Sequence, residues 1–134
     1  MAKYIYPAIF TAEENGLYSI HFPDLDSCYT SGDNLQDGYE MAGDVLCMTL
    51  YEMEENKQTV PNPSDPMTHK LKEGEFVALV SCDTIEYRLF NDNKSVKKTL
   101  TIPSWLNSMA EREGVSFSGV LQKALKQELN IDKV

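Results

Sequence analysis

Five aspartates in the first third of the sequence have the residue type and clustering that metal chemistry requires. Asp24 and Asp26 flank a turn, Asp33 follows a glycine, and Asp37 and Asp44 fall within a predicted helix. Clustered carboxylates hold the two metal ions of many nucleases. However, Asp is also common in turns and is favoured near the N-terminus of a helix. We therefore expect a solvated acidic surface without a metal ion, and a small metal-dependent nuclease is the alternative.

The remaining reactive side chains lack the spacing of a catalytic or metal site. Cys28, Cys47 and Cys82 are odd in number and far apart in the sequence. This pattern predicts free thiols in a reducing cytoplasm. His21 falls on a predicted strand, and no serine or cysteine has a spacing that would make it a base for nucleophilic catalysis. We expect a protein that is not an enzyme and that needs no cofactor.

Alternating residues near the C-terminus suit contact with DNA. From Lys97 to Ile102 the sequence predicts a short strand in which Lys97, Thr99 and Thr101 face one way while Leu100 and Ile102 face the other. Two such strands paired antiparallel form a ribbon that fits the major groove. The predicted contacts to bases are therefore these three polar residues.

Two short amphipathic helices follow this strand. Pro103 suits the start of the first helix and Gly114 its end, whereas Ser116 is a suitable N-cap for the second. The N-terminus of that second helix, at Ser116, Phe117 and Ser118, offers free N–H groups to a phosphate. A strand and two helices of this length cannot bury their apolar faces alone, so we expect a second copy of the chain to complete the unit.

The first two thirds of the sequence predict a separate body of order β-β-β-α-β, followed by a short helix. A turn at Asn15-Gly16 joins the first two strands. Asn34 is the expected N-cap of the long helix. The apolar run from Phe76 to Ser81 suits a central strand buried on both faces. The predicted elements occupy residues 3–10, 17–22, 28–31, 35–55, 76–81 and 84–90.

The distribution of charge along the 134-residue chain distinguishes these two parts, which the net charge of −9 alone does not show. Residues 1–90 contain 5 Lys or Arg and 16 Asp or Glu, a formal charge of −11. Residues 91–134 contain 7 Lys or Arg and 5 Asp or Glu, a formal charge of +2. An acidic domain over 1–90 and a mildly basic domain over 91–134 indicate partners of opposite charge. The sequence contains no apolar run long enough to span a membrane.

Residues 97–129 resemble the ribbon-helix-helix family of DNA-binding domains. The resemblance is carried by the Thr-Leu-Thr-Ile-Pro strand end, the Trp-Leu helix start and the Gly-Val-Ser-Phe-Ser turn. That family contacts bases through alternate strand residues, which would here be Lys97, Thr99 and Thr101. These three residues include no arginine or asparagine, which is a departure from the family. We therefore expect modest discrimination between bases, or discrimination shared among several dimers.

A second resemblance covers most of residues 3–82. Gly16-Leu17-Tyr18, Phe22-Pro23-Asp24-Leu25 and Gly32-Asp33 before a helix are similar to the HicB family of bacterial antitoxins. The resemblance implies an α+β protein with a truncated RNase H-like body. That body would bind and block HicA, an mRNA-cleaving ribonuclease, while the tail represses the operon as a homodimer or higher oligomer.

The toxin-binding surface near the second and third strands is expected to include some of Asp24, Asp26, Tyr29 and Asp33. A plain transcription factor whose body senses a small ligand is a further alternative to the antitoxin and to the nuclease. Each of the three functions would operate in the cytoplasm without a membrane partner.

Overall fold

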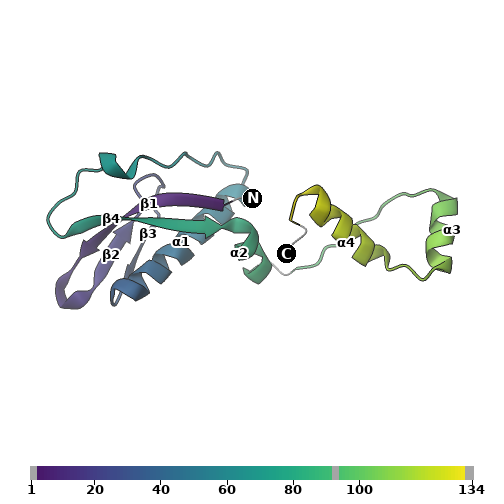
Figure 1. The fold of residues 1–134 in the computed structure, drawn as a ribbon, viewed down its shortest axis with the longest axis horizontal. Helices are drawn as coiled ribbons and strands as arrows, with labels where there is room; N and C mark the ends of the chain where they lie inside the picture. The colour runs from purple at the N-terminus through teal and green to yellow at the C-terminus, as the bar shows by residue number, and fades with distance from the viewer. Residues whose placement is uncertain (1–2, 92–93, 132–134) are drawn as a thin grey trace. The chain divides into compact units, whose positions relative to one another are not determined.

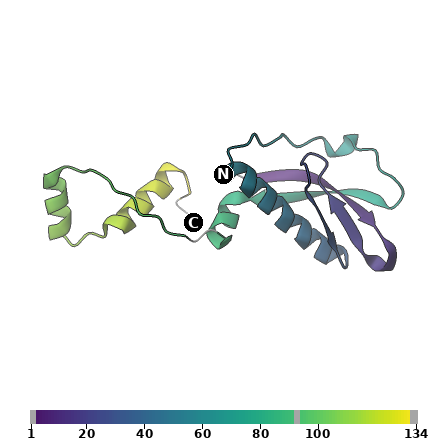
Figure 2. The same cartoon turned by 180° about the vertical axis from the view of Figure 1, so that it is seen from behind.

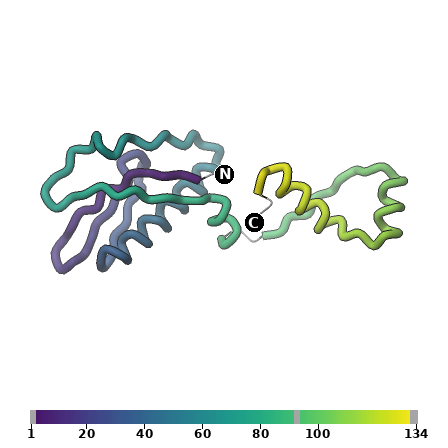
Figure 3. The backbone as a smooth tube through the Cα atoms, viewed as in Figure 1, coloured from purple at the N-terminus to yellow at the C-terminus, as the bar shows by residue number. Residues whose placement is uncertain are grey.

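The computed structural model describes residues 3–91 and 94–131, and the chain divides into two compact units between Lys94 and Ser95 (Figure 1). The described residues form an α+β fold with one four-stranded antiparallel sheet and four α-helices. Figure 3 traces the backbone of each unit. The sheet and two helices belong to the first unit, and the other two helices belong to the second.

The sheet of the first unit has the strand order β3-β2-β1-β4, and every neighbouring pair is antiparallel. The predicted Asn-Gly turn between β1 and β2 is confirmed, because Asn15 and Gly16 have φ values of 63° and 79°. Both lie in the left-handed region that Asn and Gly tolerate best. The strands are β1 (Lys3–Ala12), β2 (Tyr18–His21), β3 (Tyr29–Gly32) and β4 (Glu75–Asp83).

The prediction of a central strand at residues 76–81 is wrong. β4 lies at the edge of the sheet, and Leu79 on it is 53% exposed. The central position belongs to β1, whose residues from Tyr6 to Phe10 are all buried. An apolar run predicts burial on both faces but does not fix the order of strands, since β1 carries a comparable run.

Helix α1 (Leu35–Glu55) covers one face of the sheet, as Figures 1 and 2 show. The predicted N-cap is confirmed: the Asn34 Oδ1 accepts a hydrogen bond of 2.9 Å from the Asp37 N–H. Ala42, Leu46 and Leu50 are fully buried against the strands. The core of the unit comprises Tyr6, Ala8, Phe10, Ile20, Phe22, Leu25, Cys28, Ala42, Leu46, Leu50, Val80 and Cys82.

Close approach between β3 and the start of α1 depends on two glycines. A Cβ atom added to Gly32 would lie 2.3 Å from the backbone N and Cα of Gly38. Because real Cβ atoms do not approach a backbone so closely, only glycine at position 32 permits this packing. The contact fixes the strand against the first turn of the helix.

Helix α2 (Thr84–Asn91) follows β4 directly, in agreement with the helix predicted for residues 84–90. The Asp83 Oδ1 accepts hydrogen bonds from the Ile85 and Glu86 N–H groups at 3.0 and 3.3 Å. These contacts satisfy donors at the start of the helix. The chain therefore turns from strand into helix without an intervening loop.

The second unit contains α3 (Ser104–Arg112) and α4 (Phe117–Glu128). Pro103 stands at the N-cap of α3, and Gly114 ends that helix with φ 68°, as predicted. The Ser116 Oγ caps α4 by accepting a hydrogen bond of 3.2 Å from the Gly119 N–H. The local signals for both helices were therefore sufficient to place their ends.

The strand predicted from Lys97 to Ile102 is not present in the single chain, where these residues form neither helix nor strand. A strand requires backbone hydrogen bonds to a neighbour. The rest of the unit is helix or short connection within residues 94–131 and supplies no strand to pair with it. The β-α-α order expected of the tail is therefore seen only in its two helices.

Candidate functional site

The four residues predicted to contact a protein partner do not form one compact patch. Tyr29 begins β3 and is 70% exposed, whereas Asp33 follows the end of the same strand. They are four residue steps apart along extended chain, which corresponds to about 13 Å. Asp26 is exposed in the turn before β3. Three members of the set are thus accessible, but they lie along a strand and its turn.

The fourth member, Asp24, is engaged by the chain itself. The Asp24 Oδ2 accepts hydrogen bonds from the Ser64 N–H at 3.0 Å and from the Ser64 Oγ at 2.9 Å. The Ser64 Oγ also lies 2.7 Å from the His69 Nε2. Because the single hydroxyl proton is directed to Asp24, His69 donates to Ser64 and does not serve as its base. The three side chains anchor the proline-rich loop of residues 56–74.

The aspartates weighed as metal ligands are not gathered into a metal site. Across residues 3–91 and 94–131, no group of three or more His, Cys, Asp or Glu side chains is placed to hold a metal ion. The Asp37 Oδ2 instead accepts a hydrogen bond of 2.9 Å from the Asp33 N–H at the start of α1. The Asp37 carboxylate therefore stabilises the start of α1, and Asp33 takes part through its backbone N–H.

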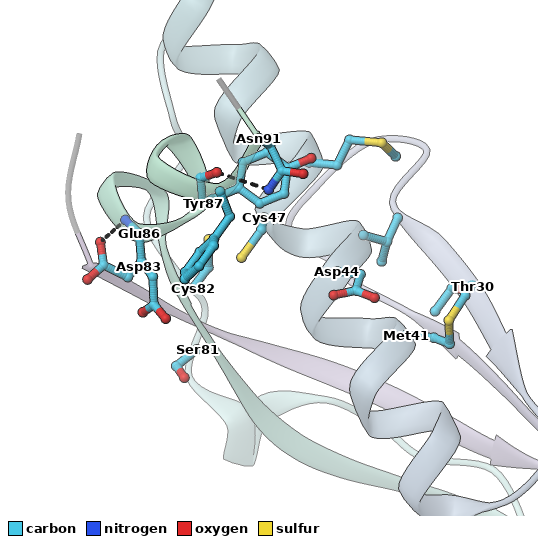
Figure 4. Close-up of a pocket in the computed structure, with 13 residues that line it drawn as sticks. Thr30, Met41, Asp44, Cys47, Ser81, Cys82, Asp83, Glu86, Tyr87 and Asn91 are labelled. Atoms are coloured by element: carbon cyan, nitrogen blue, oxygen red, sulfur yellow. Dashed lines mark hydrogen bonds between the residues drawn. The ribbon is translucent and has the colours of Figure 1, made fainter. Parts of the chain in front are cut away.

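An open groove lies between α1 and α2 and extends over the end of β4, with a volume of about 770 Å³. We call it the α1–α2 groove. Figure 4 shows Asp83, Glu86 and Tyr87 on one side of it and Met41 and Asp44, from α1, on the other. Met48 and Phe90 also line it. Sequence periodicity could not have revealed this groove, since its walls are brought together only by tertiary packing.

Two cysteines meet at this groove. Cys47 on α1 is half-buried, while Cys82 on β4 is buried, and both are free thiols. A hydrogen bond with Cys82 lowers the pKa of the Cys47 thiol below its ordinary value, although burial and the nearby Asp44 and Asp83 carboxylates oppose the effect. The same hydrogen bond, together with burial, raises the pKa of Cys82. Cys47 is therefore the more acidic thiol of the pair.

One carboxylate holds the two walls of the groove in place. The Glu54 Oε2 on α1 accepts hydrogen bonds from the Tyr4 hydroxyl at 2.8 Å and the Thr84 hydroxyl at 3.1 Å. The Glu54 Oε1 lies 3.1 Å from the Arg88 Nη2 on α2. Burial alone would raise the pKa of Glu54, but hydrogen bonds, including those from Tyr4, Arg88 and Thr84, bring it below its ordinary value. Burial, with the bond to Glu54, raises the pKa of Tyr4 to about 12.

Arg88 adds further contacts between the two helices. Its Nη1 pairs with the Glu55 carboxylate, and its guanidinium lies 4.5 Å from the centre of the Tyr51 ring. A cation placed over an aromatic face is attracted by the ring. The α1–α2 groove is consequently a preformed feature of the first unit.

The predicted DNA-binding residues are all accessible in the second unit. Lys97, Thr99 and Thr101 are exposed, as are Ser118 and Phe117, the latter at 46%. Ser116 is exposed as well and caps α4, so the N-terminus of that helix is open to a ligand. Within residues 3–91 and 94–131, no helix has both the length and the apolar character needed to cross a membrane.

Apolar side chains of the second unit are exposed to an unusual degree. Neither α3 nor α4 contains a buried residue. Trp105 is 63% exposed, and Leu100, Met109 and Val120 are each more than half exposed. Large exposed apolar patches are typical of surfaces that bind a partner.

Comparison with known proteins finds a family match that lies within the first unit. The HicB-like family, described as the "HicB_like antitoxin of bacterial toxin-antitoxin system", matches residues 5–79. Among curated proteins, no sequence gives a significant match. A chain of the "Toxin-Antitoxin complex from Streptococcus pneumoniae" is 26% identical with a TM-score of 0.61, and the alignment covers 94% of this chain and 99% of that one.

Two further structures share the fold. The "Burkholderia Pseudomallei antitoxin HicB" is 18% identical with a TM-score of 0.54, and the alignment covers 94% of this chain and 98% of that one. The "Antitoxin HicB3" structure is 23% identical with a TM-score of 0.52, and 98% of each chain is covered. The likeness in both cases extends over nearly the whole length of the chain.

Proposed function

The chain belongs to the HicB-like antitoxin family, and we propose that it acts as the antitoxin of a bacterial toxin–antitoxin pair that also represses its own operon. The family match to residues 5–79 carries this proposal, since those residues make up most of the first unit. The likeness to a chain of a toxin–antitoxin complex supports it. The protein would be a binding protein and not an enzyme, and it would act in the cytoplasm.

The first unit would bind the toxin. Residues 1–90 carry a formal charge of −11, which suits a basic ribonuclease of the HicA type and disfavours RNA or DNA. The β-β-β-α-β order with a helix across an antiparallel sheet is compatible with a truncated RNase H-like body. Binding over the ribonuclease active site would prevent mRNA cleavage without any chemistry by the antitoxin.

The second unit would form the dimer and contact operator DNA. In a ribbon-helix-helix arrangement, residues from Lys97 to Ile102 of two copies would pair as antiparallel strands, which supplies the partner that the single chain lacks. The exposed apolar residues of α3 and α4 would then be covered by the second copy. Lys97, Thr99 and Thr101 would face base edges, while Ser116, Phe117 and Ser118 would lie near phosphates.

The toxin-binding role is tested by co-expression with the product of the neighbouring gene, which this proposal expects to be a small basic ribonuclease. The full chain should co-purify with it and suppress RNA cleavage, and so should a fragment of residues 1–94, because the core of the first unit is complete within it. Cleavage that continues at saturating antitoxin would contradict the role. Hydrolysis of RNA by the chain itself with Mg²⁺ or Mn²⁺ would favour the nuclease instead.

The DNA-binding role is tested by competition between the upstream region of its own gene and random duplex. Thr101→Ala should weaken operator binding by about 1–3 kcal/mol and leave random DNA nearly unaffected. Ser116→Ala should weaken both, because it loosens a cap worth about 1 kcal/mol and a phosphate contact. If replacing Lys97, Thr99 and Thr101 together left the operator preference intact, this segment would not be the recognition element.

A further inference from the structure

We propose that the α1–α2 groove is the docking surface for a basic, amphipathic segment of the toxin. This inference rests on the proposed antitoxin function and adds the location and the chemistry of the contact. The volume of the groove, about 770 Å³, is within the range of ligand-binding pockets, and the groove lies wholly within the first unit. It is distinct from the set Asp24, Asp26, Tyr29 and Asp33, none of which lines it.

The apolar side chains of the groove are exposed to solvent in the single chain. Met41 and Met48 are 40% and 48% exposed, and Phe90 is 74% exposed. Methionine and aromatic side chains are enriched at protein interfaces, and methionine adapts its shape to a partner. Phe90 is the largest of these exposed side chains and the expected anchor of the contact.

The charged part of the groove is entirely acidic. Asp44, Asp83 and Glu86 line it, and no Lys or Arg among the described residues does. Arg88 on α2 does not neutralise them, because its guanidinium is engaged with Glu54, Glu55 and the Tyr51 ring. An apolar floor with an acidic rim fits a segment that presents apolar residues on one face and Lys or Arg beside them.

Charge decides between the possible occupants. A ribonuclease binds phosphates through Lys and Arg, so its RNA-binding surface has the charge that this groove attracts. RNA itself would be repelled, as would the first unit of a second copy with its formal charge of −11 over residues 1–90. Docking of the RNA-binding surface here would also exclude the substrate, which explains neutralisation by steric and electrostatic means together.

Contacts already described hold the groove open in the form that would receive the partner. Glu54 ties α1 to α2 through Arg88 and to β1 through Tyr4. A site whose walls are fixed before binding loses less conformational entropy when it binds. The toxin segment would therefore meet an almost unchanged surface.

The decisive binding experiment measures how matched substitutions in the full-length chain affect binding to the HicA-type toxin that the proposed function expects from the neighbouring gene. Met48→Asp and Asp44→Lys alter the groove. Met67→Asp repeats the first substitution and Glu14→Lys repeats the charge reversal of the second, both at exposed positions outside the groove. The groove variants should weaken toxin binding by about tenfold or more, and the control variants should not. Asp44→Lys should also flatten the dependence of affinity on salt.

Two outcomes of that comparison separate the inference from the function on which it rests. Melting temperature and operator binding should be the same for all four variants, which shows that they are folded. If all four bind and inhibit the toxin as the unaltered chain does, the groove is not the docking surface although the antitoxin function stands. If the unaltered chain fails to bind the ribonuclease, the proposed function and this inference both fall.

Thiol labelling gives an independent measurement of what covers the groove. In a Cys47→Ser background, Met48→Cys should react with a maleimide in the free chain and be protected at least tenfold when toxin is bound. Met67→Cys should react equally in both states. Protection in the free chain would show that another part of this protein fills the groove, and unchanged labelling in the complex would show that nothing does; either result overturns the inference.

Discussion

Glu54 joins three elements through one carboxylate, so its protonation should affect the whole first unit. Its folded-state pKa is lowered by the hydrogen bonds it accepts, including those from Tyr4, Arg88 and Thr84, although burial opposes this. A carboxylate whose pKa is lower in the folded state adds stability above its unfolded-state pKa and loses it as the pH falls through the folded-state value. The contribution should therefore be complete near neutral pH and decline below about pH 4.5.

The prediction is that Glu54→Gln lowers the free energy of unfolding at pH 7 by about 1–3 kcal/mol. The loss should shrink as the pH falls through the acidic range, since the native carboxylate is then protonated too. Urea unfolding followed by circular dichroism at pH 7 and pH 3.5 measures both effects. Glu52→Gln, an exposed position on the same helix, is the control and should change neither. An equal loss at both pH values would show that the charge on Glu54 is unimportant.

Cys47 should be the first thiol to react with iodoacetamide. It is half-buried while Cys28 and Cys82 are buried, and its hydrogen bond with Cys82 favours the thiolate, which is the nucleophile. Burial raises the pKa of Cys28 and slows its reaction. Mass spectrometry of the folded protein after brief alkylation should locate the first adduct on Cys47, and a first adduct on Cys82 would contradict the arrangement described for the groove.

Side chains that act locally could be predicted from the sequence, whereas those with distant partners could not. Asn34, Gly114 and Ser116 were placed correctly because a cap depends on the few residues that follow or precede it. The hydrogen bond between Asp24 and Ser64, 40 residues further along the chain, was not predicted. No local sequence pattern predicts a contact between residues so far apart in the sequence.

At the scale of elements, the packing of β3 on α1 tolerates only glycine at position 32. We expect Gly32→Ala to destabilise the protein by more than 3 kcal/mol, since the added Cβ would lie 2.3 Å from the Gly38 backbone and something must move. Gly43→Ala is the matched change within α1, where a Cβ meets nothing within 4 Å. It should stabilise the helix by about 0.5–1 kcal/mol. Thermal melts of the two variants should shift in opposite directions, and equal shifts would refute this account.

The order of strands was the element-level feature that the sequence did not determine. Both β1 and β4 contain runs of apolar residues, and either run suits a central strand. β1 is an inner strand because one of its edges pairs with β2, to which a tight turn connects it, and its other edge pairs with β4. The second partner follows α1 and a long loop, so its position depends on packing that no single segment specifies.

At the scale of the whole molecule, the second unit should depend on a second chain. Leu121→Asp places a charge on the apolar side of α4, where dimerisation would bury it at a cost of several kcal/mol. Lys123→Asp introduces the same residue on the opposite side of the helix, about 200° away. Sedimentation should find a monomer for the first variant and a dimer for the second. A dimer that survives Leu121→Asp would rule out a dimer interface on this side of α4.

The pairing of the first strand with the last has a consequence for synthesis on the ribosome. β1 leaves the ribosome before β2, β3 and β4, yet its register with β4 joins Tyr4 to Cys82 and Phe10 to Phe76. After β1 is made, roughly 70 more residues must be added, which takes roughly 4 to 14 s at usual translation rates. During that interval β2 and α1 can already pack on β1, but the edge of β1 that pairs with β4 has no partner from this unit. The sheet can therefore be completed only after β4 has been synthesised, and chaperones and proteases have that interval in which to act on each new molecule.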